Sequence, residues 1–250
     1  MNDDANFRRS RGAPPLVFGH RGVRGEAPEN TMAAFECAAA GGADGVELDV
    51  RLCRSGELVV CHDADLTRLT QGRDTRRVVD LDRAELAQVD VGKGQPIPAL
   101  TEVLAWAECR RLRVNIEMKR DVLDRRAVVR ETARVLEAGA LPPVIVSSFD
   151  PGMLAYLSWL RPSVLLGYLF ASDQTLTRSG WMARVIHVGA VHPERTEIDA
   201  ARCRAWQKRG RLVNVWTVND AAEARALAAM GVDALITDVP RRIGDIVRRC

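Results

Sequence analysis

The sequence contains no long apolar run. None of its 250 residues lies in a stretch of the ~20 apolar residues that a bilayer-spanning helix needs, so we expect no integral membrane segment. The first residues, MNDDANFRRSRG, also lack the apolar core of a secretory signal peptide. These two absences favour a cytoplasmic protein.

Closely spaced cysteine pairs are also absent. The chain has 6 cysteines, but they are scattered and form no CxxC pair. This spacing predicts neither a zinc site nor a disulfide framework. We therefore expect the cysteines to be reduced thiols, as is usual in the cytoplasm.

The chain has no excess of one charge. Its 36 lysines and arginines face 33 aspartates and glutamates, and the two signs are mixed along the sequence, leaving a net charge of +3. This balance argues against a nucleic-acid partner held by bulk electrostatics. The arginines among the first dozen residues are interpreted as part of a solvated, flexible N-terminal arm over residues 1–14.

From about residue 15 onward, short apolar runs alternate with longer alanine-rich segments. Eight of the runs are strand candidates, at residues 16–19, 45–51, 113–118, 144–147, 164–168, 185–191, 212–217 and 234–237. The apolar fraction of 47% is enough for a sizeable core. Eight strands alternating with helices predict an α/β protein, and favour a closed (β/α)8 TIM barrel over an open sheet.

Helix candidates follow most of these runs. They include residues 31–40, 125–138, 153–159, 199–208, 221–230 and 241–249. A polar segment with the sequence DLTRLTQGRDTRRVVDLD breaks the alternation, and loops of this length are usually lids or small subdomains. We therefore interpret residues 65–97, approximately, as a small insertion after the second strand of a single barrel domain spanning residues 15–250.

Two of the candidate strands alternate apolar and polar residues. Because side chains along a strand point to opposite faces in turn, Glu47 and Asp49 share one face, and Glu117 lies on the polar face of the later strand. The apolar faces pack beneath the helices, so the carboxylates look into the barrel mouth. Unpaired carboxylates there would be costly, and a divalent cation is the simplest compensation. The alternative is a purely structural cluster of ion pairs.

Two histidines lie where the candidate strands end. His20 follows the first strand directly, and His62 follows the apolar run at residues 58–60. Active sites of barrels lie at the carboxyl ends of their strands, so both histidines are placed where a general acid and a general base would act. Taken singly, either histidine could equally be structural.

An ordered set of motifs runs along the chain. In sequence order they are HRG, APENT, ELDV, HD followed by LxRxT, IPALTEVL, NIEMK, SSFD, VHP, VWTVN and GVDALITDVP. Together they resemble the glycerophosphodiester phosphodiesterases over residues 16–240, approximately. The resemblance implies a (β/α)8 barrel that hydrolyses small-molecule glycerophosphodiesters to glycerol 3-phosphate and an alcohol.

The resemblance also implies a metal site and a pair of catalytic side chains. Glu47, Asp49 and Glu117 match the ligands of one divalent cation, Mg²⁺ or Ca²⁺, and an all-oxygen ligand set suits these hard cations. His20 and His62 match the catalytic histidines, one accepting a proton from the attacking oxygen and the other donating one to the leaving alkoxide.

Four further residues match substrate-binding positions of the family. Arg21 and Lys119 match positions that hold the phosphate, and Phe149 and Trp216 match aromatic positions at the rim of the pocket. The resemblance leaves open whether this rim contacts the glycerol or the leaving group.

Other polar residues are interpreted mainly as structural, or their roles are left open. Asn30 and Asp238 precede helix candidates and are interpreted as N-caps. Arg51 shares a face with the carboxylates and is a candidate to pair with them. Glu29 and His192 are each left open between a structural role and a role at the pocket.

Two alternative functions compete with this one. A lysophospholipase D-like or sphingomyelinase D-like barrel would cleave lipid phosphodiesters, but the charged insertion argues mildly for soluble substrates. A non-catalytic barrel that only binds phosphodiesters would not need the two histidines and three carboxylates together. Barrel helices can also pair into a homodimer, although no segment singles out an interface.

Overall fold

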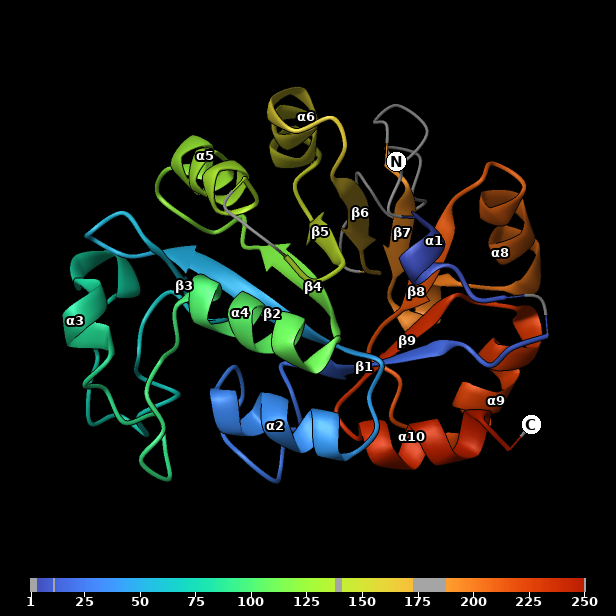
Figure 1. Ribbon diagram of the computed structural model, residues 1–250, viewed down its shortest axis with the longest axis horizontal. Helices are drawn as coiled ribbons and strands as arrows, with labels where there is room; N and C mark the ends of the chain where they lie inside the picture. The colour runs from blue at the N-terminus through green and yellow to red at the C-terminus, as the bar shows by residue number, and fades with distance from the viewer. Residues whose placement is uncertain (1–3, 11, 138–140, 173–187, 250) are drawn as a thin grey trace.

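The computed structural model describes residues 4–10, 12–137, 141–172 and 188–249 (Figure 1). Within these residues, eight parallel strands close into a barrel, because the first strand pairs with both the second and the last. The barrel strands are β1 (Leu16–His20), β2 (Gly45–Leu52), β4 (Arg113–Met118), β5 (Val144–Ser148), β6 (Leu165–Phe170), β7 (Ala190–Pro193), β8 (Leu212–Val215) and β9 (Ala234–Thr237). The predicted α/β barrel is confirmed.

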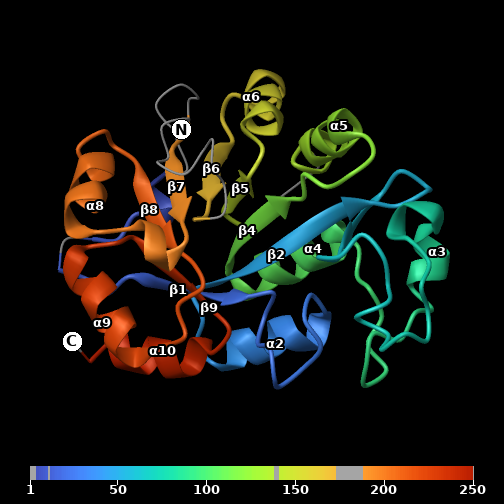
Figure 2. The same cartoon turned by 180° about the vertical axis from the view of Figure 1, so that it is seen from behind.

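Within the described residues, helices lie on the outside of the barrel between strands (Figures 1 and 2). The main ones are α2 (Met32–Ala40), α4 (Leu100–Arg110), α5 (Arg125–Val135), α6 (Pro151–Leu160), α8 (Ala200–Gln207), α9 (Ala221–Met230) and α10 (Pro240–Val247). Four of them begin at an aspartate whose side chain accepts hydrogen bonds from amides of the first turn, namely Asp124, Asp150, Asp199 and Asp220. Each cap fixes the residue at which its helix begins. The four caps therefore set the length of the loops that join these helices to the preceding strands at the barrel mouth.

One helix was not predicted, and several element boundaries differ from the predicted ones. Helix α4 was not among the predicted helices, although its buried residues have the spacing of a helix face. Strand β7 begins at Ala190, and residues 185–187 of the predicted strand lie outside the described residues. Strand β8 ends at Val215, two residues before the predicted end.

The N-terminal residues are docked on the barrel, in contrast to the solvated arm that the sequence indicated. Phe7, in the short helix α1 (Asp4–Phe7), is 1% exposed and stacks on Phe18 with 6.2 Å between the ring centroids. It belongs to a cluster with the first residues of β6, β7, β8 and β9, at the end of the barrel opposite the mouth. The arginines that follow Phe7 are docked as well, since Arg8 Nη2 donates to the carbonyl of Gly210 at 2.8 Å and Arg9 Nη1 to that of Ala228 at 3.1 Å.

The insertion builds a small core of its own. Strand β3 (Leu58–Val60) pairs antiparallel with β2, and the chain then forms the short helices η1 (Val78–Asp80) and α3 (Arg83–Leu86). Ten buried residues, among them Leu66 and Leu86, form an apolar cluster separate from the barrel core. Figure 1 shows this unit beyond the carboxyl end of β2. The predicted insertion after the second strand is therefore a folded part of the mouth.

No helix within residues 4–10, 12–137, 141–172 and 188–249 combines the length and the apolar character needed to cross a membrane.

Candidate active site

Three carboxylates meet inside the barrel mouth. Glu47 and Asp49 lie two residues apart on β2, and Glu117 pairs in register with Asp49 on the neighbouring strand β4. One carboxylate oxygen of each residue lies within 4.8 Å of the others. The alternation seen in the sequence thus brings the three predicted ligands together, because neighbouring parallel strands present the same face at matched positions.

Burial makes this cluster electrostatically strained. The pKa of the Glu47 carboxyl is raised to about 8, first because it is buried and next because Asp49 lies beside it. Glu47 therefore binds a proton more tightly than a free glutamate does. A cation among these oxygens would displace that proton and remove the repulsion, so the donor set fits a hard divalent cation.

Two cationic side chains already approach the cluster. Lys119 Nζ lies 2.8 Å from Glu117 Oε1 and 3.3 Å from Asp49 Oδ1, and Arg21 Nε lies 3.1 Å from Asp49 Oδ2. Although burial alone would raise it, the pKa of Asp49 is lowered because Lys119 and Arg21 stabilise its charged form. Both predicted phosphate-binding residues are therefore at the site, held by the carboxylates.

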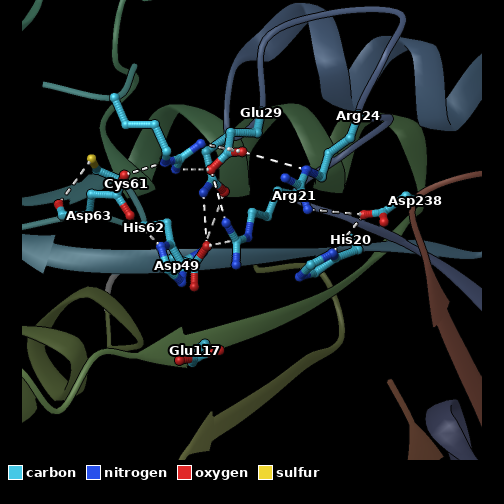
Figure 3. A network of polar contacts seen from close by, with 12 residues as sticks. His20, Arg21, Arg24, Glu29, Asp49, Cys61, His62, Asp63, Glu117 and Asp238 are labelled. Carbon is cyan, nitrogen blue, oxygen red and sulfur yellow. Dashed lines mark hydrogen bonds and ion pairs between the residues drawn. The ribbon is translucent and has the colours of Figure 1, made fainter. Parts of the chain in front are cut away.

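His20 is oriented by a carboxylate from the other end of the chain. Its Nδ1 lies 2.8 Å from Asp238 Oδ1 (Figure 3), and its Nε2 lies 4.0 Å from Glu47 Oε2. Asn219 donates to the second oxygen of Asp238 at 2.7 Å. Burial lowers the pKa of His20, whereas the hydrogen bond to Asp238 and the charge of Glu47 raise it. The raising effects together are larger, so the net shift of the pKa is upward.

His62 has the same kind of partner at Nδ1. Its Nδ1 lies 2.6 Å from Asp63 Oδ1, and Arg68 Nε lies 2.5 Å from Asp63 Oδ2. A carboxylate at Nδ1 favours the tautomer in which that nitrogen carries the proton. Both histidines therefore present Nε2 for proton exchange.

Glu29, whose role the sequence left open, is a buried hub for arginines. Arg21 Nη1 lies 2.9 Å, Arg68 Nη2 2.7 Å and Arg24 Nε 3.5 Å from its carboxylate oxygens (Figure 3). Burial would raise the pKa of Glu29, yet hydrogen bonds from Arg68 and the charge of Arg21 lower it. Glu29 thus helps to hold the Arg21 guanidinium group in place.

The two predicted aromatic residues form a pair at the carboxyl ends of β5 and β8. Phe149 and Trp216 pack edge to face, with 5.6 Å between their ring centroids. The Arg120 guanidinium lies 5.4 Å from the Phe149 centroid, within the range of a cation–π contact. Trp216 is anchored by a hydrogen bond from its indole nitrogen to the carbonyl of His192 at 2.8 Å.

The predicted N-cap role of Asn30 is wrong. Thr31 caps α2, accepting a hydrogen bond from the amide of Ala34 at 3.3 Å. Asn30 has a φ of 58° and donates through Nδ2 to Asp49 Oδ2 at 2.9 Å. Its left-handed backbone turns the side chain away from the helix and towards the buried carboxylate, which offers the stronger, charge-assisted hydrogen bond.

The predicted cap role of Asp238 is also wrong. Helix α10 begins after Val239 without a side-chain cap, and Asp238 instead holds His20. Closure of the barrel places the end of β9 beside the end of β1. The Asp238 carboxylate therefore bonds to the His20 imidazole and not to the first amides of α10. The sequence signal that could have revealed this is the position of Asp238 directly after a barrel strand.

Arg51 does not pair with the carboxylates of the cluster. Its Nη2 lies 2.6 Å from Asp121 Oδ2 and donates to the carbonyl of His62 at 2.7 Å. These contacts join the loop after β4 to the segment that carries His62. The side chain is long enough to reach past the cluster towards these acceptors at the rim.

His192 has structural contacts. Its ring is completely buried, and Asn214 Nδ2 lies 3.0 Å from its Nε2. Burial lowers the pKa of His192 to about 3, so the imidazole is neutral. The buried ring and its bond to β8 favour the structural role that the sequence had left open.

We expect His192 to lower the free energy of unfolding of the protein at acid pH. Its pKa is about 3 when folded and 6.5 when unburied, so the unfolded chain binds the proton first and the free energy of unfolding falls as pH drops through this window. Between pH 7 and pH 5 this contribution is about 2 kcal/mol. Urea unfolding at both pH values should show a smaller loss for His192→Gln than for the wild type. Equal losses would contradict the prediction.

Comparison with known proteins gives a consistent result. The model of the glycerophosphoryl diester phosphodiesterase family matches residues 20–242. A glycerophosphodiester phosphodiesterase of Caldanaerobacter subterraneus is 32% identical over 242 residues, covering 94% of this chain and 98% of the relative.

Solved structures agree with the sequence comparison. A glycerophosphodiester phosphodiesterase of Thermotoga maritima is 30% identical, with a TM-score of 0.76 over 93% of this chain and 98% of that one. A phosphodiesterase of Oleispira antarctica, solved with the product sn-glycerol-3-phosphate, is 27% identical, with a TM-score of 0.81 over 94% of this chain and 97% of that one.

Proposed function

This chain belongs to the glycerophosphoryl diester phosphodiesterase family and is a phosphodiesterase, and from that premise we propose that it uses one divalent cation and two histidines to release glycerol 3-phosphate. The observation that carries the proposal is the geometry of the mouth. Three clustered carboxylates share the mouth with two histidines, each of which is held at Nδ1 by an aspartate. This arrangement supports hydrolysis of a phosphodiester by positioned proton transfers.

Glu47, Asp49 and Glu117 are the proposed ligands of the cation, Mg²⁺ or Ca²⁺. Their oxygens lie close enough together to share one ion, and burial together with the charge of Asp49 raises the pKa of Glu47, an effect that a bound cation would oppose. When bound, such an ion polarises a phosphoryl oxygen and orients neighbouring hydroxyl groups. With one divalent ion, three carboxylates and the cations Arg21 and Lys119, the site carries one positive charge, which a phosphodiester neutralises.

His20 and His62 are the proposed proton carriers. Since Asp238 and Asp63 hold the two Nδ1 atoms, each Nε2 is left to exchange a proton with the substrate. One histidine accepts a proton from the attacking oxygen, and the other donates a proton to the departing alkoxide. The lack of symmetry between their surroundings supports two different roles, because His20 faces Glu47 while Asp63 of the other pair contacts Arg68.

Arg21 and Lys119 are proposed to hold the phosphate, and the aromatic pair Phe149 and Trp216 to contact the glycerol or the leaving group. Both cations lie against Asp49, so they point into the same space as the carboxylates. The complex of the Oleispira antarctica relative with sn-glycerol-3-phosphate supports a substrate of this size. Residues 15–250, including the insertion, are proposed to act as one catalytic domain, because the barrel closes only when β9 pairs with β1.

The first experiment is an assay of the purified protein on glycerophosphocholine and glycerophosphoethanolamine. We expect release of glycerol 3-phosphate with Mg²⁺ or Ca²⁺ and loss of that release with a chelator, restored when the cation is added back. Release that survives exhaustive chelation would contradict the metal site. Absence of release with either cation, while lysophospholipids are cleaved, would contradict the substrate class.

A further inference from the structure

The insertion sends one arginine into the barrel mouth. Arg68 holds Glu29 with two parallel bonds, at 2.7 Å to Oε1 and 3.0 Å to Oε2, and its Nε lies 2.5 Å from Asp63 Oδ2. A guanidinium group matches two carboxylates in this way because its five donors lie in a rigid plane. Arg68 therefore joins two carboxylates that come from different loops of the mouth.

The turn that carries Arg68 is itself well anchored. Leu66 is completely buried in the apolar cluster of the insertion. Thr70 closes the turn, since its hydroxyl donates to the carbonyl of Leu66 at 2.8 Å and accepts from the amide of Asp74 at 2.9 Å. The small core of the insertion thus fixes the backbone from which Arg68 extends.

Each carboxylate held by Arg68 also holds a residue of the proposed mechanism. Asp63 contacts His62 Nδ1 at 2.6 Å, and Glu29 contacts Arg21 Nη1 at 2.9 Å (Figure 3). One continuous path of charge-assisted contacts therefore runs from His62 through Arg68 to Arg21. Such outer contacts set the tautomer and direction of the groups that they support.

We propose that Arg68 is a positioning residue, through which the insertion aligns His62 and Arg21 with each other. This inference rests on the proposed function, because it assigns Arg68 to the proton transfer and phosphate binding described above. Without Arg68, Asp63 loses the contact that holds its second oxygen, and among the described residues Glu29 keeps Arg21 and the more distant Arg24 as partners.

The chain offers a matched control for a merely structural ion pair. Arg54 is exposed to a similar degree, 53% against 49% for Arg68, and it also holds two carboxylates, Asp82 at 2.7 Å and Glu85 at 2.8 Å. None of the contacts of Arg54 within the described residues reaches either histidine. If Arg68 only stabilised the insertion, replacing either arginine by alanine would have the same effect.

The kinetic test compares Arg68→Ala, Arg68→Lys and Arg54→Ala on glycerophosphocholine with saturating cation. We expect kcat of Arg68→Ala to fall about 10–100-fold, as for other residues that orient a reacting side chain. Lysine should restore part of the rate, because it keeps the charge without the fork. Arg54→Ala should keep the wild-type kcat, and equal kcat values for Arg68→Ala and Arg54→Ala would overturn the proposal.

A second measurement does not depend on turnover. The ¹⁵N shifts of the His62 ring, read through its carbon-bound protons and assigned with His62→Gln, report its tautomer. We expect one tautomer in the wild type and in Arg54→Ala, and a mixture in Arg68→Ala. An unchanged tautomer in Arg68→Ala would overturn the proposal even if the protein cleaves no glycerophosphodiester, a result that bears on the proposed function alone.

Discussion

Replacing His20 or His62 by glutamine will lower kcat about 10²–10⁴-fold, the usual contribution of a positioned proton transfer. Each histidine is held by an aspartate at Nδ1, and glutamine cannot carry a proton between the substrate and solvent as imidazole does. The fold should survive, because neither side chain belongs to the apolar clusters. Steady-state kinetics and thermal unfolding of both variants measure the two effects.

A substrate with a good leaving group separates the two roles. A glycerophosphodiester of p-nitrophenol needs little protonation of its departing oxygen, so the variant without the general acid should regain much of the wild-type rate on it. The variant without the general base should stay slow on every substrate. A histidine whose replacement leaves kcat near the wild-type value on glycerophosphocholine has no place in the mechanism.

Glu117→Gln will give the second large effect, a loss of cation affinity. Residues that only support a metal ligand already cost about 10–100-fold in affinity when replaced, so loss of a ligand should raise the cation concentration for half-maximal activity by at least about 100-fold. Glu117 is simpler to replace than Asp49, because Glu117 pairs with Lys119 whereas Asp49 contacts Lys119, Arg21 and Asn30. Titration of activity with Mg²⁺ and with Ca²⁺ measures the shift.

Glu137→Gln is the control for this experiment. Its side chain is 70% exposed and pairs only with Arg161 among the described residues, so removal of its charge should leave the titration unchanged. If Glu117→Gln required no more cation than this control, the carboxylate would be a structural partner of Lys119 and not a metal ligand.

The periodicity of two strands predicted the centre of the site. Glu47 and Asp49 alternate with buried apolar residues, and the same pattern surrounds Glu117, so local geometry alone determines which face each carboxylate occupies. The histidines were predicted for a similar reason, because each directly follows an apolar run and active sites of barrels lie at strand ends.

The supporting residues were not predictable in this way. Asp238 was interpreted as a helix cap, and Asn30 as another, because both have the residue type and position that caps prefer. Helix α4 and the docking of Phe7 were not predicted, because the polar residues next to them gave a misleading local signal. The position next to a polar insertion obscured the helix, and the aromatic ring is flanked by arginines and polar residues that indicate a solvated segment.

By itself, the sequence determined the class of fold, the membership of the family and the faces on which the reactive side chains lie, because these depend on short-range periodicity and on motifs read in order. The tertiary structure alone decided which polar side chains from distant parts of the sequence become partners. His20 and Asp238 are 218 residues apart, and Arg68 and Glu29 are 39 apart. Such pairs form only when the barrel closes and the insertion folds against its mouth, and local preference carries no information about contacts across that distance.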